Sequence, residues 1–159
     1  MTTVAFDGNK LAADTQITSD WKSTGHSKFY KFHDGAVGAF AGTWSRILEA
    51  QRFLDGLSDH CPDEDWSALV IRADRRVYFM DCDGCRMDIT GMHYAIGSGS
   101  HFALGAMACG KDAAEAVRIS FGLDQYTGGD VESIEVGDIP PLPRRAKTTK
   151  RSTSKQARS

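Results

Sequence analysis

The sequence predicts a single domain of the α+β class, in which helices are layered against β-sheets. Its 159 residues are enough to bury a hydrophobic core, and 41% hydrophobic and 25% charged residues are ordinary for a globular protein. Strand and helix patterns come in separate blocks: strands, one helix, strands, two helices and a closing strand. Because alternating strand–helix units would favour a parallel sheet instead, this segregation favours the α+β class.

Turn signals near the N-terminus predict two β-hairpins. In the first hairpin, the turn DGN at 7–9 separates apolar segments at 4–6 and 11–13. Aspartate, glycine and asparagine between two such segments are typical of a tight turn. The second hairpin covers about residues 28–41 and turns at 33–35 (HDG). We therefore expect the chain to begin with antiparallel strands.

One amphipathic helix is expected after the second hairpin. Thr43 is a suitable N-cap, because its hydroxyl can accept a hydrogen bond from a backbone N–H of the first turn. Apolar residues at helical spacing then form one stripe that ends near Gly56. This stripe consists of Ile47, Leu48, Ala50, Phe53, Leu54 and Leu57. The acidic segment SDHCPDEDW at 58–66 is too short for more than one further helical turn, so we expect a loop there.

The second half of the chain is predicted to contain a strand meander, two helices and a last strand. Turn-separated apolar segments predict strands at 68–72, 77–81, 86–89 and 93–96. A helix of small residues follows at 102–109 and ends at a glycine. Asp112 and Glu115 have the spacing of a capping box, which predicts a helix that continues to about Phe121. A strand at 131–136 closes the domain.

Charge divides the chain into an acidic body and a basic tail. Residues 144–159 hold seven basic residues and no acid, which leaves 12 basic and 21 acidic residues in 1–143. We expect a folded domain over 2–137 and a proline-containing linker with a disordered tail over 138–159, because the tail has too few apolar residues to offset its ordering entropy. A tail that binds nucleic acid is the alternative to a solvated one.

Familiar metal, nucleotide and hydrolase motifs do not explain the sequence. Cys82 and Cys85 have CxxC spacing, but a zinc ribbon needs a second ligand pair, and the Asp-Gly between them favours a hairpin turn. The segment 105–112 is close to a phosphate-binding loop, yet Asp112 stands where serine or threonine would bind magnesium. The five histidines are scattered, and no GxSxG motif occurs. We therefore expect no required cofactor and no metal.

The first residues offer a different kind of chemistry. Removal of Met1 is plausible because a small residue follows it, and Thr2 then carries a hydroxyl and a free α-amine on one residue. An α-amine has an ordinary pKa of about 7.7–8.0 and can act as a base near neutral pH. One residue would then supply both nucleophile and general base, as in the N-terminal threonine variant of covalent catalysis.

Several motifs in a fixed order resemble one family. The order is TTVAFDGNKLAADTQIT at 2–18, Lys28, then the motifs GAFAGT, AIGSGS and LDQYTGGD. Taken jointly, these motifs resemble the proteasome β-subunit family and its compact bacterial relative, the HslV peptidase, over roughly residues 2–136. The resemblance implies the four-layer αββα sandwich of N-terminal nucleophile hydrolases, shortened here after the first helix.

The resemblance also implies a catalytic set around Thr2. Thr2 is the implied nucleophile, Asp14 matches the family's buried aspartate, and Lys28 matches the lysine that pairs with it. A cation near the α-amine lowers the pKa of that amine and keeps more of it neutral. Asp14 would orient Lys28 and offset the cost of burying its charge.

Further site residues are implied at the edges of this set. Gly42 matches the glycine whose backbone N–H binds the oxyanion, an interaction that is strong when water is excluded. Thr18 is expected to bind the substrate backbone, and Phe40 to lie near the floor of the main specificity pocket. A polar cluster is expected around the terminal amine, formed by Ser98, Asp124 and Thr127.

These observations predict a threonine-type peptidase that cleaves peptides or unfolded proteins. Family precedent implies a ring-shaped homo-oligomer and an ATPase unfoldase as partners. A catalytically inactive scaffold or assembly subunit with the same fold is the alternative. The sequence contains neither an apolar run long enough to span a membrane nor a secretory signal, so we expect a cytoplasmic protein.

Overall fold

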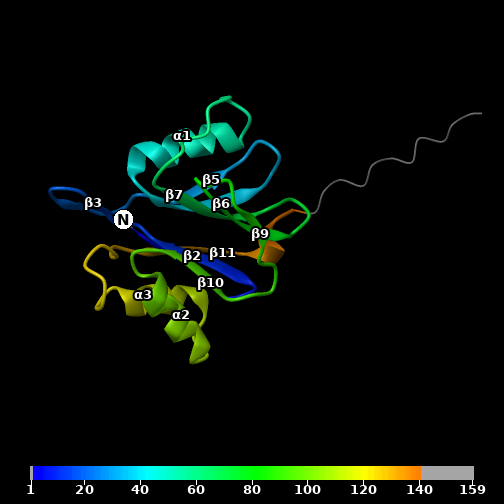
Figure 1. Cartoon of the computed structure of the whole chain (residues 1–159). Coiled ribbons are helices and arrows are strands. Elements are labelled where there is room, and N and C mark those ends of the chain that lie inside the picture. Colours follow the sequence, from blue (N-terminus) through cyan, green and yellow to red (C-terminus); the bar gives the residue numbers. More distant parts are fainter. Residues whose placement is uncertain (1, 141–159) are drawn as a thin grey trace, which may run out of the picture.

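The computed structural model describes residues 2–140 of the chain. Figure 1 shows helix α1 (Trp44–Leu54) on one side, then two sheets face to face, then helices α2 (Ser100–Ala108) and α3 (Ala113–Ser120) on the other side. The predicted α+β class is confirmed. Most of the predicted linker and tail, from residue 141 onward, lies outside the described residues.

The chain begins in a four-stranded antiparallel sheet. Its strand order is β10 (Tyr94–Gly97), β1 (Thr3–Phe6), β2 (Lys10–Asp14) and β11 (Val131–Glu135). The predicted DGN turn joins β1 to β2, where the Asp7 carboxylate accepts hydrogen bonds from the Asn9 and Lys10 N–H groups. The first hairpin is therefore confirmed.

A second antiparallel sheet contains the other hairpin and most of the predicted meander. In spatial order its strands are β5 (Phe29–Lys31), β6 (Val37–Gly42), β7 (Trp66–Ile71), β8 (Val77–Asp81) and β9 (Arg86–Asp88). The prediction that the strand near residues 93–96 continues this meander is wrong, because β10 pairs with β1 in the other sheet. A short β3–β4 hairpin (Ile17–Thr18 and Lys22–Ser23) stands apart from both sheets.

The main hydrophobic core lies between the two sheets. Alternate residues of each strand point into it, as the two-residue period of a strand requires. The buried members of this core are Val4, Phe6, Leu11, Ala13, Ala39, Ala41, Leu69, Ile71, Val77, Ile89, Ile96 and Ile139. Ile139 belongs to this core although it follows residue 137, where the sequence places the end of the domain.

Helices cover the outer faces of both sheets. Helices α2 and α3 pack on small residues of the four-stranded sheet, such as Ala5 and Ala12, and α3 begins at the predicted capping box. On the other sheet, α1 buries Ile47 and Ala50. The predicted stripe on α1 is only partly correct, because two of its members, Leu48 and Leu57, are exposed. No helix of residues 2–140 is long and apolar enough to cross a membrane.

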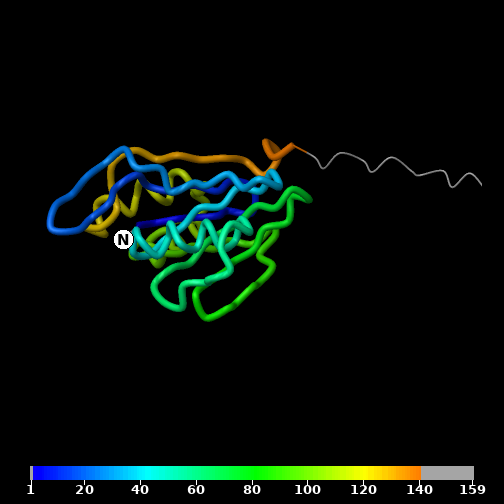
Figure 2. Tube along the Cα trace, turned by 90° about the horizontal axis from the view of Figure 1, so that it is seen from above, coloured from blue at the N-terminus to red at the C-terminus, as the bar shows by residue number. Residues whose placement is uncertain are grey.

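Strand register brings predicted site residues, or their neighbours in sequence, to one end of the sheets. Thr3 is paired with Gly97, Asp14 with Val131, and Gly42 with Trp66. The β3–β4 hairpin extends beyond the sheets at this same end, beside the start of the chain (Figures 1 and 2). Residues far apart in sequence are therefore neighbours here.

Candidate active site

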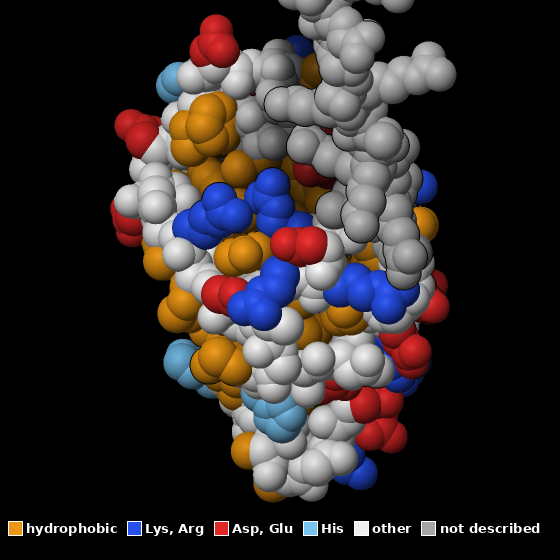
Figure 3. All heavy atoms as spheres, turned by 90° about the vertical axis from the view of Figure 1, so that its right-hand side faces the viewer, with side chains coloured by type: hydrophobic (Ala, Val, Ile, Leu, Met, Phe, Trp, Pro, Cys, Tyr) orange, Lys and Arg blue, Asp and Glu red, His pale blue; other side chains and the backbone are white. Residues whose placement is uncertain are grey.

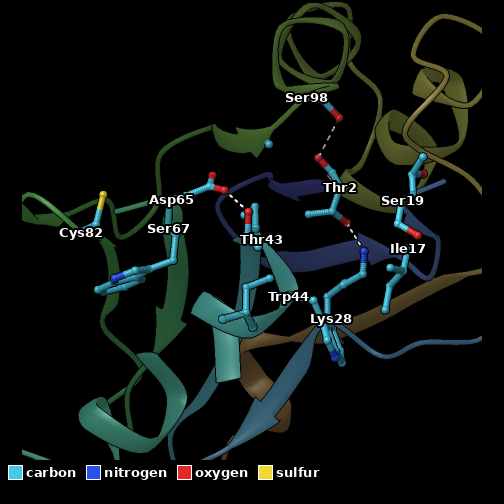
Figure 4. A pocket seen from close by; sticks show the side chains of 16 residues that line it. Thr2, Ile17, Ser19, Lys28, Thr43, Trp44, Asp65, Ser67, Cys82 and Ser98 are labelled. Atoms are coloured by element: carbon cyan, nitrogen blue, oxygen red, sulfur yellow. Dashed lines mark hydrogen bonds between the residues drawn. The ribbon is translucent and has the colours of Figure 1, made fainter. Parts of the chain in front are cut away.

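A cavity of about 790 Å³ opens at the end of the sheets where the chain begins. The strand ends and the loops next to them supply its walls, and Figure 4 shows Thr2 between Ser98 on one side and Lys28 on the other. Its lining residues are Thr2, Ile17, Thr18, Ser19, Lys28, Ala41, Gly42, Thr43, Trp44, Ile47, Asp65, Trp66, Ser67, Cys82, Gly97 and Ser98. A cavity of this size is within the range of small-molecule sites.

The Thr2 hydroxyl lies between a buried carboxylate and a buried ammonium group. Its Oγ1 donates a hydrogen bond to Asp14 Oδ1 and accepts one from Lys28 Nζ at 2.6 Å. Lys28 Nζ also donates to the Gln16 carbonyl oxygen at 2.7 Å and lies 3.7 Å from Asp14 Oδ1. Both charged side chains are almost completely buried. Three predicted site residues are thus brought together.

Backbone N–H groups hold the Asp14 carboxylate. Oδ1 accepts from the Thr3 N–H at 3.0 Å, while Oδ2 accepts from the N–H groups of Gln16 at 3.3 Å and Gly128 at 3.1 Å. Burial lowers the pKa of Lys28 below its ordinary value, and the nearby Asp14 charge offsets only part of that effect. A buried ammonium group with a lowered pKa exchanges its proton more readily near neutral pH.

A second polar cluster joins the loop before α2 to the loop after α3. Asp124 Oδ2 accepts hydrogen bonds from Ser98 Oγ at 2.6 Å and Thr127 Oγ1 at 2.5 Å. The pKa of Asp124 is lowered: burial raises it, but the bonds from Ser98, Thr127 and a backbone N–H outweigh burial. Ser98 N–H donates to the Thr2 carbonyl at 2.8 Å, and Thr127 Oγ1 lies 2.6 Å from Thr3 Oγ1.

The cluster therefore holds the first two described residues through their carbonyl and hydroxyl groups. The sequence also places Ser98, Asp124 and Thr127 around the terminal amine that Thr2 would carry after loss of Met1, and that arrangement stays a prediction. The bonds that the structure describes end on the Thr2 carbonyl and the Thr3 hydroxyl. The cluster thus fixes the start of β1, which positions the Thr2 side chain over the cavity.

Two glycines allow backbones to meet beside Thr2. Gly42 has φ +134°, and a Cβ on it would lie 2.1 Å from the Asp65 carbonyl oxygen. Gly97 has φ +92°, and its Cβ would lie 1.9 Å from the Thr2 carbonyl oxygen. Such conformations and contacts exclude other residues, so these positions require glycine. They bring the ends of both sheets close to Thr2.

Of the two predicted substrate-binding residues, one lines the cavity and one does not. Thr18 lies on the wall formed by the β3–β4 hairpin. Phe40, predicted to lie near the floor of the specificity pocket, is not among the lining residues, and its side chain is fully buried in the core between β6 and α1. Its backbone has a different role: Phe40 N–H donates to the Lys28 carbonyl at 3.1 Å, which ties Lys28 to β6.

Three further residues at the site were not among those predicted. The Gln16 carbonyl accepts from Lys28, and its side-chain amide donates to Thr18 Oγ1 at 2.9 Å. Thr3 binds Asp14 and Thr127, and Asp65 carries a carboxylate on the cavity wall. The paired threonines behind Met1 were a usable signal for Thr3. Gln16 and Asp65 act through tertiary contacts that no local motif indicates.

The cysteines of residues 2–140 form neither a disulfide nor part of a metal-ligand group. Across residues 2–140 all four cysteines are free, and no three His, Cys, Asp or Glu side chains gather as metal ligands would. Cys82 follows β8 and lines the cavity, whereas Cys85 is exposed. The segment between them makes the turn from β8 to β9, as its Asp-Gly pair predicts.

Comparison with known proteins identifies the fold. No protein-family model and no curated protein matches the sequence. The structure is similar to BPH from Thiobacillus denitrificans in complex with epoxomicin, with a TM-score of 0.68 and 19% identity over 85% of this chain and 97% of that chain. BPH alone gives a TM-score of 0.67 and 20% identity, with the same coverage.

A eukaryotic HslV from Trypanosoma brucei is also similar, with a TM-score of 0.62 and 19% identity over 84% of this chain and 97% of that chain. Each of these structures is matched over nearly its whole length. The resemblance seen in the sequence is thereby confirmed in structure: the chain has the fold of BPH and HslV.

Proposed function

We propose that this protein is a threonine-type peptidase in which Thr2, freed by removal of Met1, attacks peptide carbonyl groups. One observation carries the proposal: Thr2 lines an open cavity while its Oγ1 bonds to the buried Lys28 Nζ at 2.6 Å. Burial of a lysine and an aspartate against one hydroxyl is costly, and such clusters are typical of catalytic sites. The proteasome-like fold supports the same chemistry.

The proposed reaction begins when Thr2 Oγ1 attacks the carbonyl carbon and its proton passes to the Thr2 α-amine. The C–N bond of the tetrahedral intermediate then breaks, and the same proton is transferred to the leaving amine. Water, deprotonated by the α-amine, then attacks the resulting ester. The ester C–O bond breaks as the protonated α-amine gives that proton to Thr2 Oγ1, which frees Thr2. Lys28 contributes positive charge at Oγ1, which favours the alkoxide and keeps the α-amine neutral.

Other residues position these groups or stabilise charge. Asp14 holds Lys28 and the start of β1. The Gly42 backbone N–H is our candidate for the oxyanion donor, because Gly42 lines the cavity wall next to Thr43. Ser98, Asp124 and Thr127 are positioning residues, since they act through the Thr2 carbonyl and the Thr3 hydroxyl. Thr18 is placed to bind the substrate backbone.

The assembly is proposed on the same basis. We regard the layers in Figure 1 as the expected four-layer αββα sandwich, with a loop at 55–65 after α1 in place of a further helix. We propose a ring of identical subunits that encloses the Thr2 sites, and an ATPase unfoldase that delivers unfolded protein. No cofactor is required by the proposed steps.

Peptide hydrolysis by three proteins tests this proposal. Purified wild type, Thr2→Ala and Thr2→Ser are assayed with an unfolded protein and with fluorogenic peptides, after mass spectrometry has confirmed loss of Met1. We expect wild type to cleave, Thr2→Ser to retain measurable activity, and Thr2→Ala to fall to background with an unchanged fold. Equal turnover by Thr2→Ala would contradict the proposal. No cleavage by wild type with a free Thr2 would favour the scaffold alternative.

A further inference from the structure

The cavity carries one acidic side chain. Of the sixteen residues that line it, only Lys28 and Asp65 are charged, and Lys28 belongs to the Thr2 site. Asp65 lies on the opposite wall, where the loop after α1 enters β7 (Figure 4). We propose that Asp65 makes this cavity select a cationic side chain, arginine or lysine, on the residue whose carbonyl Thr2 attacks. This inference rests on the proposed peptidase function.

The backbone fixes the Asp65 side chain in place. Asp65 has φ +54°, and its carbonyl oxygen accepts from the Thr43 N–H at 3.1 Å. The Thr43 hydroxyl donates to Asp65 Oδ2, as Figure 4 shows. The missing Cβ of Gly42 gives the Asp65 carbonyl the space it occupies. Contacts with two residues beside Thr2 therefore hold the carboxylate at the wall of the cavity.

Among residues 2–140, the Asp65 carboxylate has no cationic partner: no Lys, Arg or His forms an ion pair with it. The acid that precedes Asp65 in the sequence, Glu64, does have a partner: its Oε1 lies 2.9 Å from Arg46 Nη2. Lys28 is bonded to Thr2, Gln16 and Asp14 instead. Within the described part of the chain this carboxylate therefore faces the cavity without a cationic partner, and a bound cation would supply one.

The rest of this wall suits the stem of a long basic side chain. Trp44, Ile47 and Trp66 line the same cavity with apolar side chains, and Thr43 adds a hydroxyl group. Lysine and arginine bury their methylene groups along apolar surface and keep the charged end at a polar one. The apolar residues of the cavity suit the methylene stem of such a side chain, and the Asp65 carboxylate suits its charged end. A glutamate side chain would be repelled by Asp65.

A purely structural explanation of Asp65 exists and makes a different prediction. Aspartate and asparagine both tolerate a positive φ, so Asp65 could be needed only for the turn before β7. Asparagine would then replace it without consequence, since its side-chain oxygen still accepts from Thr43. A role in recognising a cation depends on the charge, which asparagine lacks.

The test compares two peptides that differ only in charge. One fluorogenic peptide has arginine before the scissile bond, and the other has citrulline, which has nearly the same shape without the charge. For wild type we expect kcat/KM to be about tenfold higher with arginine, the size of one partly exposed charge-assisted hydrogen bond. This ratio should decrease as NaCl rises from about 0.05 to 0.5 M, because salt screens exposed charges.

Two variants complete the experiment. Asp65→Asn should reduce the arginine-to-citrulline ratio to near one, whereas Asp63→Asn, an exposed acid in the same loop that does not line the cavity, should leave it unchanged. A wild-type ratio near one, or a ratio near ten that survives in Asp65→Asn, would overturn the inference.

A binding measurement separates this inference from the peptidase proposal. If wild type with a free Thr2 cleaves neither peptide, the proposed function fails, and peptide binding to wild type is followed through tryptophan fluorescence. Tighter binding of the arginine peptide that is lost in Asp65→Asn would keep the cationic subsite. Equal binding of both peptides would overturn it.

Discussion

Each end of the molecule holds an ion pair between a basic residue and an aspartate, and the two pairs differ in burial. At the end where the chain begins, Lys28 and Asp14 keep 2% and 0% of their side-chain surface exposed. At the other end, Arg76 and Asp88 keep 53% and 35%. Figure 3 shows that second face, where basic, acidic and hydrophobic side chains are mixed.

The difference indicates what each pair is for. Removing two charges from water costs several kcal/mol per ion, so a buried pair contributes little net stability. An exposed pair costs little and contributes about 0–1 kcal/mol in typical cases. Lys28 and Asp14 are therefore best explained by the Thr2 hydroxyl that they both contact. The exposed Arg76–Asp88 pair is explained as an ordinary surface ion pair, without a role in catalysis.

Replacing the basic residue of each ion pair should distinguish the catalytic pair from the surface pair. The replacement of Lys28 gives the largest expected effect. Lys28→Met should reduce kcat/KM by about a thousandfold, because both the charge at Oγ1 and the partner of Asp14 are lost. It should also lower the free energy of unfolding by about 3 kcal/mol, since Asp14 stays buried and unpaired. Peptide turnover and urea unfolding measure these effects. Arg76→Met is the control, and an equal loss of turnover there would contradict the comparison.

The far end should depend on apolar packing more than on its ion pair. Ile139 lies in the core between the sheets, and Arg75 binds its carbonyl oxygen. Ile139→Ala should lower the free energy of unfolding by about 3 kcal/mol, and Ile139→Val by about 1 kcal/mol. Urea denaturation measures both. If Ile139→Ala leaves the free energy of unfolding unchanged, the domain ends at residue 137, as the sequence suggested.

The smallest expected effect belongs to Asp88. Hydrogen bonds from the Thr90 hydroxyl and N–H, with help from Arg76, lower the pKa of Asp88 from 3.8 to about 2. A carboxyl whose pKa is lowered in the folded protein stabilises the fold at pH values above its pKa in the unfolded chain. That contribution is lost as pH falls toward 2. Asp88→Asn should therefore be slightly less stable than wild type at pH 6 and equal to it near pH 2. Thermal unfolding at both pH values checks this, and a difference that grows in acid would contradict it.

Local signals predicted most of the fold. The DGN turn and the Asp112–Glu115 capping box depend only on neighbouring residues, and both are found where expected. The sheet that β10 joins depends instead on pairing with β1, about ninety residues earlier in the chain, and a local pattern does not contain that information. Leu48 fits a helical stripe by spacing, yet it lies on the exposed side of α1.

Some residues of the candidate site were predicted from the sequence and others were not. Thr2, Asp14 and Lys28 were proposed together from the order of motifs, and the structure brings them into contact. The role of Phe40 was implied by the resemblance alone, and its side chain is buried toward α1 and does not line the cavity. Asp65 was not predicted, because its position depends on a tertiary contact with Thr43 and on the turn before β7.

Intact-mass measurement with a peptide vinyl sulfone tests the central claim most directly. A nucleophilic hydroxyl adds to this electrophile without a leaving group, so the protein gains the full mass of the probe. The account predicts a wild-type chain that lacks Met1 and carries one probe, and a Thr2→Ala chain that carries none. A wild-type chain that keeps Met1, or a Thr2→Ala chain labelled as fast as wild type, would contradict it.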